Sequence, residues 1–216
     1  MNRSKLVLGT MLCALLIFLV GWWFTADKSS PLSVVNELSQ DTTLIRPYSP
    51  VLGPKNAPVT IVEFFDPGCE ACRAMHPVLV EIRKRYPNEV RIVMRYAAFH
   101  DGSDIAVRIL ETAQLQNLFE PVLEALLKSQ PRWADHSGAK LDIAWAAAAD
   151  AGLDIEKARQ QMKSPEINFV LTQDAADIKT IGVRQTPTFF VNEKPLLEFG
   201  ARQLMEMVDK EVESTR

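Results

Sequence analysis

The chain has 216 residues, enough for one well-buried domain with appendages but hardly for two full domains. Its 24 Lys and Arg residues against 27 Asp and Glu residues give a formal net charge of −3, and no basic cluster breaks the pattern, so nothing indicates nucleic-acid binding. Three cysteines are too few for a small scaffold held together by disulfides.

An uncharged apolar run, Leu6–Phe24, follows Arg3 and Lys5 near the N-terminus. As a helix it would be about 28 Å long, close to the hydrocarbon thickness of about 30 Å. The basic residues would keep residues 1–5 in the cytoplasm and send the rest of the chain outward. A cleaved signal peptide is the alternative, but the end of the run offers no small-x-small cleavage site. We therefore predict an uncleaved transmembrane anchor at 6–24.

Residues 25–57 are expected to form a tether between this anchor and the folded domain. They contain several serines, one short apolar stretch and four prolines, Pro31, Pro47, Pro50 and Pro54. Within this segment, 43–48 has the pattern of a short edge strand. Fully extended, the tether would reach on the order of 100 Å from the membrane.

A strand-like run, Val59–Phe65, ends at a Pro-Gly corner, and a helical pattern continues from Ala71. Cys69 and Cys72 lie at the start of this helix with two residues between them. The first N–H groups of a helix lack intrahelical partners and favour negative charge, so a thiolate there is stabilised and its pKa falls. We predict a redox-active pair with Cys69 as the exposed attacking cysteine and Cys72 as the more buried resolving cysteine.

The cysteine pair has two other possible interpretations. Half of a zinc site would need further ligands, but Cys13 lies in the apolar run and the histidines, His76, His100 and His136, have no ligand spacing. A purely structural disulfide would close so short a loop that little chain entropy is removed. We therefore predict no metal, and no cofactor other than the redox-active Cys69–Cys72 disulfide itself.

The remaining elements are expected in the following order: a strand at Glu89–Tyr96, a block of helices across 102–181, strands at Thr188–Asn192 and Leu196–Phe199, and a closing helix at Arg202–Val212. This order predicts an α/β domain made of 58–101 and 182–214 that carries an all-α insertion at 102–181. Asp154 and Ser164 have the residue type and position of helix N-caps within the insertion.

Thr186 and Pro187 lie just before the strand at 188–192, more than a hundred residues after the cysteines. Together with the strand, the dithiol and its helix, this pair makes the sequence resemble the thioredoxin superfamily over about residues 50–212. The helical insertion resembles that of the DsbA-type disulfide oxidoreductases. The resemblance therefore implies a thioredoxin-like fold with an inserted helical subdomain, preceded here by one transmembrane helix.

The resemblance also implies roles for further residues. Thr186 and Pro187 would form a cis-proline loop beside the cysteines, where the residue before the proline offers backbone hydrogen bonds to a substrate strand. Glu63 occupies the place of a buried acid that helps to move the proton of the resolving thiol. Pro77 matches a proline that kinks the active-site helix.

The dipeptide between the cysteines departs from the strongly oxidising relatives, which have Pro-His where this chain has Glu70 and Ala71. A histidine there helps to hold the thiolate, whereas a glutamate repels it. A stable thiolate makes the disulfide a stronger oxidant, so Glu70 predicts a milder reduction potential.

The expected function is thiol–disulfide exchange with cysteine-containing protein substrates, as a DsbA-like oxidase. The protein would be anchored in the bacterial inner membrane by a single span, with its catalytic domain facing the periplasm or cell exterior, where disulfides persist. A membrane redox partner would renew the active pair. An anchored reductase or isomerase is the alternative within this class. A redox-inactive thioredoxin-like module that binds peptides as a chaperone is the alternative from another class.

Overall fold

Two parallel strands form the centre of the folded chain: β2 (Val59–Phe65) and β3 (Val90–Tyr96) pair in register from Val59 with Val90 to Phe65 with Tyr96. The computed structural model describes residues 43–135 and 137–216. All seven residues of β2 are buried, as expected for a central strand covered on both faces.

Three further strands complete the sheet, in the order β1-β3-β2-β6-β7. They are β1 (Val51–Leu52), β6 (Thr188–Val191) and β7 (Lys194–Pro195), and each pairs antiparallel with its neighbour. Because β6 lies beside β2, the residues just before β6 are brought to the end of β2, where the cysteines follow.

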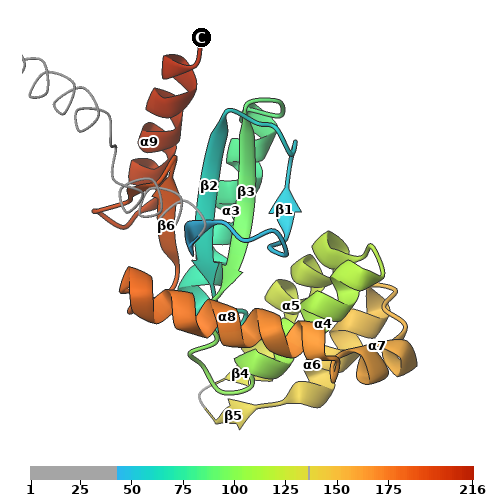
Figure 1. The fold of residues 1–216 in the computed structure, drawn as a ribbon. Helices are drawn as coiled ribbons and strands as arrows, with labels where there is room; N and C mark the ends of the chain where they lie inside the picture. The colour runs from blue at the N-terminus through green and yellow to red at the C-terminus, as the bar shows by residue number, and fades with distance from the viewer. Residues whose placement is uncertain (1–42, 136) are drawn as a thin grey trace, which may run out of the picture. The chain divides into compact units, whose positions relative to one another are not determined.

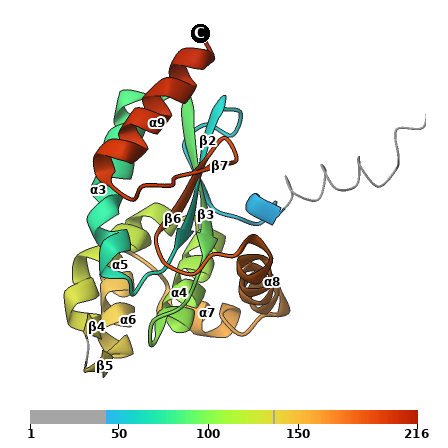
Figure 2. The same cartoon turned by 90° about the vertical axis from the view of Figure 1, so that its left-hand side faces the viewer.

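Helices cover both faces of the sheet. Figure 2 shows α3 (Glu70–Arg85) and α9 (Ala201–Ser214) on one face and α8 (Pro165–Ile181) on the other. Alternate residues of β2 pack into the cores on the two faces of the sheet, since neighbouring side chains of a strand point to opposite faces. Ile61 and Phe65 join the large core with α3, and Phe64 joins a smaller core with Ile178 of α8.

The remaining helices form the insertion between β3 and β6: α4 (Ser103–Leu115), α5 (Phe119–Trp133), α6 (Leu141–Asp150), α7 (Ile155–Gln161) and α8. Figure 1 shows α4, α5, α6 and α7 gathered beyond the ends of β2 and β3. Asp154 and Ser164 cap α7 and α8, accepting hydrogen bonds from the N–H groups of Lys157 and Ile167. The predicted α/β fold with a helical insertion is thus confirmed. It also contains a small hairpin of β4 (Ala134–Asp135) and β5 (Gly138–Ala139) that was not predicted.

The strand predicted at Leu196–Phe199 is wrong. Asn192 and Glu193 both have positive φ, as in a two-residue hairpin turn, so pairing resumes immediately at Lys194. β7 ends at Pro195, and the Leu196 N–H donates one further hydrogen bond to the Phe189 carbonyl oxygen, at 2.9 Å.

The predicted tether, 25–57, is wrong over residues 43–57, which belong to the folded unit that extends from 43 to 216. Thr43 and Leu44 are helical instead of extended, and the edge strand is β1. Arg46 and Tyr48 bind two buried acids of α8, through hydrogen bonds to Asp177 and Asp174.

The predicted anchor, Leu6–Phe24, and the tether up to residue 42 lie outside the described residues. Within 43–135 and 137–216, no helix has the length and apolar character needed to cross a membrane.

Candidate active site

The two cysteines lie where β2 turns into α3. Cys69 is the N-cap residue of α3, with φ −77° and ψ 122°, and Cys72 lies one turn further along the helix. The backbone N–H groups of Ala71 and Cys72 are among the groups that lower the pKa of the Cys69 thiol. These are the N–H groups that a helix leaves without intrahelical partners, so the helix start supplies donors to a thiolate.

The environment of Cys69 lowers its pKa to about 5. The largest cause is a hydrogen bond from the Cys72 thiol; burial opposes it, and the Thr186 side chain and the helix N–H groups add to it. As a thiol, Cys69 donates to the Thr186 carbonyl oxygen, 3.2 Å from its sulfur. The groups that stabilise the Cys69 thiolate lower its pKa by more than this hydrogen bond from the thiol raises it, so the thiolate is favoured.

Cys72 has the opposite preference. Its pKa is raised because of burial, the hydrogen bond it donates to Cys69, and the nearby charge of Glu63. The prediction that Cys69 is exposed is wrong, since it is only 6% exposed, although Cys72 is wholly buried at 0%. Packing of Thr186 against the Cys69 sulfur accounts for this low exposure.

Thr186 and Pro187 lie beside the dithiol, although Thr186 is 117 residues from Cys69 in the sequence. The peptide bond between them is cis. The antiparallel pairing of Thr188 in β6 with Phe64 in β2 places this pair next to the corner that leads to Cys69.

Glu63 lies in β2 on the face that α3 covers and is only 1% exposed. Neither carboxyl oxygen has a hydrogen-bond partner among the described residues. Burial, and then the charge of Cys69, raises the pKa of Glu63 to about 8. The carboxyl borders a crevice that has no room for a water molecule. It can therefore hold or release a proton near neutral pH, next to a thiol whose own pKa is raised.

Glu70 and Ala71 are the first two residues of α3. Glu70 is exposed, and Ala71 supplies one of the N–H groups directed at Cys69. A cavity of about 680 Å³, here called the dithiol cavity, opens beside Cys69 and is bordered by Glu70, His100 and Asp101. Pro77 lies inside α3, as the resemblance implied.

Asp66 and Gln130 hold the turn before Cys69, and neither of them was identified from the sequence. Asp66 is fully buried and accepts hydrogen bonds from the N–H groups of Gly68 and Phe99, at 2.8 and 2.7 Å. Gln130 of α5 donates to the carbonyl oxygens of Pro67 and Cys69, at 2.7 and 2.9 Å. The position of Asp66, directly after a buried strand and just before the cysteines, could have indicated a role in the site. The sequence around Gln130 has no feature that sets it apart from other polar helix residues.

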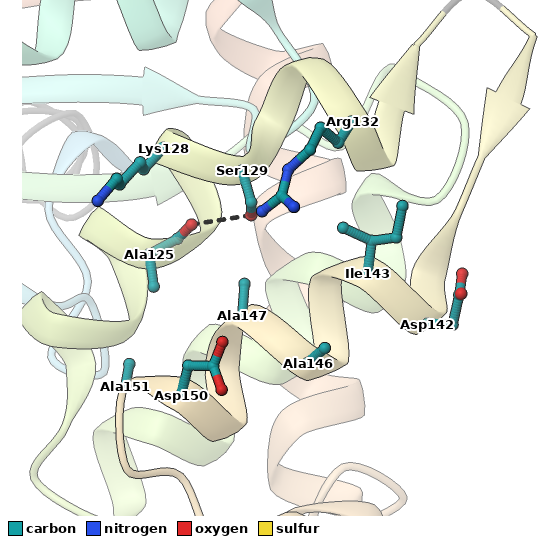
Figure 3. A pocket seen from close by; sticks show the side chains of 10 residues that line it. All are labelled: Ala125, Lys128, Ser129, Arg132, Asp142, Ile143, Ala146, Ala147, Asp150 and Ala151. Carbon is teal, nitrogen blue, oxygen red and sulfur yellow. Dashed lines mark hydrogen bonds between the residues drawn. The ribbon is translucent and has the colours of Figure 1, made fainter.

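A second cavity, of about 670 Å³, lies between α5 and α6 and contains none of these residues (Figure 3). Its walls carry basic side chains from α5 and acidic ones from α6, namely Lys128, Arg132, Asp142 and Asp150. In the part of the chain that the structure describes, no group of three or more His, Cys, Asp and Glu side chains is arranged to hold a metal ion.

Comparison with known proteins places this geometry among related chains. A family model described as thioredoxin matches residues 46–210. A thioredoxin-like oxidoreductase from Silicibacter pomeroyi is 31% identical, with a TM-score of 0.68 over 78% of this chain and 95% of that one. α-DsbA1 of Wolbachia pipientis is 18% identical, with a TM-score of 0.72 over 82% of this chain and 96% of that one, which supports the fold alone.

Curated relatives include a protein named Na(+)/H(+) antiporter NhaA from Herminiimonas arsenicoxydans, 28% identical over 213 residues. The match covers 98% of this chain but 32% of that protein. The chain thus spans about a third of the length of the curated relatives it matches.

Proposed function

The chain belongs to the thioredoxin family, and on this basis we propose that it is a DsbA-like thiol oxidase that donates the Cys69–Cys72 disulfide to cysteine-containing protein substrates. Thiol–disulfide exchange through its own cysteines is the chemistry common to thioredoxin-like oxidoreductases. The direction of exchange, the substrates and the cellular location are the parts that are proposed here.

The unequal pKa values of the two thiols carry the proposal. A pKa of about 5 keeps Cys69 as a thiolate at neutral pH, while Cys72 remains a thiol. Stabilising the thiolate favours the reduced protein over the disulfide. The disulfide therefore accepts electrons readily and is the stronger oxidant of the two partners in exchange.

The proposed reaction begins with a substrate thiolate that attacks the Cys69 sulfur of the disulfide. The Cys69–Cys72 bond breaks, a mixed disulfide forms at Cys69, and Cys72 leaves with the electron pair. The neutral carboxyl of Glu63 supplies the proton that Cys72 needs, because its pKa of about 8 leaves it protonated at neutral pH.

A second substrate thiolate then attacks the substrate sulfur of the mixed disulfide. The substrate disulfide forms, and Cys69 leaves as the stable thiolate, so the two electrons of the substrate reside in the dithiol. We further propose that the backbone of Thr186, preceding the cis bond to Pro187, pairs with the substrate segment. Its carbonyl oxygen lies 3.2 Å from the Cys69 sulfur, within reach of a residue that flanks the substrate cysteine.

The proposal includes a location and a partner. The apolar run Leu6–Phe24 with its preceding basic residues supports a single-pass anchor in the inner membrane and a catalytic domain facing the periplasm or cell exterior. A membrane redox protein would take the two electrons from the dithiol and restore the disulfide after each cycle.

The reduction potential of the full chain, equilibrated with glutathione buffers, tests the direction. We expect a value between the about −120 mV of DsbA and the about −270 mV of thioredoxin, because Cys69 is stabilised while Glu70 adds a repelling charge. A protein that also oxidises a reduced peptide substrate supports the oxidase. A potential as low as that of thioredoxin would instead identify a reductase.

A further inference from the structure

His100 is the basic side chain among the described residues that border the dithiol cavity. The same cavity is bordered by the acidic side chains of Glu70, Asp101 and Asp135 and by the Cys69 thiol. The dipeptide between the cysteines supplies no cation, so among the described residues that border this cavity, 136 not being one of them, the positive charge nearest the thiolate is that of His100.

A buried carboxylate fixes the position of His100. The Asp66 side chain has 0% exposure, and one of its oxygens lies 2.7 Å from Nδ1 of the His100 ring. The same oxygen accepts the His100 backbone N–H at 3.0 Å, and Ser103 donates its hydroxyl to the other oxygen. Both the backbone and the ring of His100 are thus bound to a residue that directly follows β2.

The segment before Cys69 packs against His100. A Cβ atom built on Gly68 would lie 3.0 Å from the Cβ of His100 and 2.6 Å from the hydroxyl oxygen of Ser103. The Gly68 N–H also binds Asp66, at 2.8 Å. Glycine therefore permits a close approach that places the residue preceding Cys69 directly against the residue that carries the imidazole.

The contact with Asp66 determines which ring nitrogen can respond to the cavity. A carboxylate at Nδ1 keeps a proton on that nitrogen, so protonation and deprotonation occur at Nε2. The side chain is 50% exposed, so Nε2 can exchange its proton with solvent. Asp66 and His100 form an arrangement in which a buried anion orients and supports a half-exposed imidazolium.

We propose that the His100 imidazolium, held by Asp66, stabilises the Cys69 thiolate across the dithiol cavity and so raises the oxidising power of the disulfide. The inference rests on the proposed thiol–disulfide exchange. In this proposal, His100 from the loop after β3 has the role that a histidine between the cysteines has in the strongly oxidising relatives. His100 thereby offsets the charge of Glu70 at the same cavity.

The charges that face His100 are consistent with this role. Burial disfavours the imidazolium, but the hydrogen bond to Asp66 and the negative charges of Asp66, Cys69 and Glu70 outweigh it, and the pKa of His100 is raised. Coupling between two titrating groups is reciprocal, so a thiolate that favours the imidazolium is itself favoured by it. Asp101 and Asp135 add negative charge to the same cavity.

The test is the substitution His100→Gln in the full-length chain, with Cys13→Ser as background so that the alkylation followed is that of Cys69 and not of Cys13. The pKa of Cys69, taken from the pH dependence of its alkylation, should rise by about one unit. The equilibrium constant with glutathione should shift about tenfold toward a less oxidising disulfide. His100→Lys should keep both values near those of the parent, because it keeps the charge.

Lys128→Gln serves as the matched control, since it removes one positive charge from the other cavity (Figure 3). It should leave both values unchanged. If His100→Gln gives the same two values as Lys128→Gln, the inference is wrong. The parent chain could have a potential as low as that of thioredoxin while His100→Gln still raises the pKa of Cys69. That result would contradict the proposed oxidase function but support the role of His100 in stabilising the thiolate.

A histidine titration by NMR covers the case in which His100→Gln does not fold. In the unsubstituted chain, alkylation of Cys69 removes the thiolate and should lower the pKa of His100. A His100 titration that is identical before and after alkylation would overturn the proposal.

Discussion

At the scale of single residues, burial of Glu63 lowers the stability of the fold, while its carboxyl is positioned to exchange a proton with Cys72. A carboxyl that is fully buried without a hydrogen-bond partner destabilises the fold whenever it is charged. Its pKa rises from 4.5 to about 8 on folding, so the folded state binds the extra proton between these values and stability falls as pH rises through that window.

The substitution Glu63→Gln tests both aspects. It should raise the free energy of unfolding of the reduced protein by about 1–3 kcal/mol at pH 7, measured by urea denaturation, and the gain should vanish below pH 4.5. It should slow the oxidation of the dithiol by glutathione disulfide about tenfold or more at pH 8, where about half of the Glu63 carboxyl groups are ionised and can accept the Cys72 proton. Alkylation of Cys69 at neutral pH serves as the control and should hardly change. A gain in stability without slower oxidation would show that Glu63 takes no part in proton transfer.

At the scale of elements, α5 connects the helical insertion to the reactive corner through Gln130. Its side chain is 1% exposed, donates to the carbonyl oxygens of Pro67 and Cys69, and accepts from the guanidinium of Arg73 at 2.8 Å. The insertion thus satisfies backbone groups that the turn between β2 and α3 leaves open. We expect the order of this turn to depend on α5.

Replacing Gln130 with Leu should therefore lower the free energy of unfolding by about 1–3 kcal/mol, since two buried carbonyl oxygens lose their donor. Ser129→Ala is the matched control, because within the described part of the chain the Ser129 hydroxyl donates to carbonyl oxygens of its own helix alone, those of Ala125 and Leu126. It should cost less than the Gln130 substitution in the same urea titration. Equal losses for the two variants would contradict a specific role of Gln130.

Elements with a strong local pattern could be predicted, and elements defined by distant partners could not. β2 and α3 follow from an apolar run and a helical period, and Asp154 and Ser164 cap the helices expected of them. Residues 43–57 resembled a tether because they contain three of the four prolines of the segment 25–57, Pro47, Pro50 and Pro54. Their place in the domain depends on Asp174 and Asp177, which bind Arg46 and Tyr48 from more than a hundred residues away.

The same distinction applies to the site. The spacing of Cys69 and Cys72 at a helix start predicted which thiol is the more acidic. The burial of Cys69 could not be predicted in this way, because it depends on Thr186, which the pairing of β6 with β2 brings to the corner. Asp66 and His100 were missed for a similar reason: their contact joins the ends of two neighbouring strands.

At the scale of the whole molecule, the pKa of Cys69 couples the redox state to the stability of the fold. Folding lowers this pKa from 9.0 to about 5 in the reduced protein. The folded state therefore holds fewer protons between these values, and its stability rises with pH across that window and is lost as pH falls through 5. The oxidised protein has no thiol at this position and lacks this dependence.

We therefore expect the reduced full-length chain to gain about 2–3 kcal/mol over the oxidised chain between pH 5 and pH 7. Parallel urea titrations of the two redox forms at several pH values measure this difference directly. The disulfide closes a very short loop, so its own contribution to the oxidised form is small and independent of pH. The Cys69→Ser protein cannot form the disulfide and has no group at this position that ionises in this range, so it should lack the rise in stability with pH that the Cys69 thiolate gives the reduced chain. A difference between the two forms that stays constant from pH 5 to pH 7 would show that the Cys69 thiolate does not stabilise the reduced fold, and the argument for an oxidising disulfide would lose its physical basis.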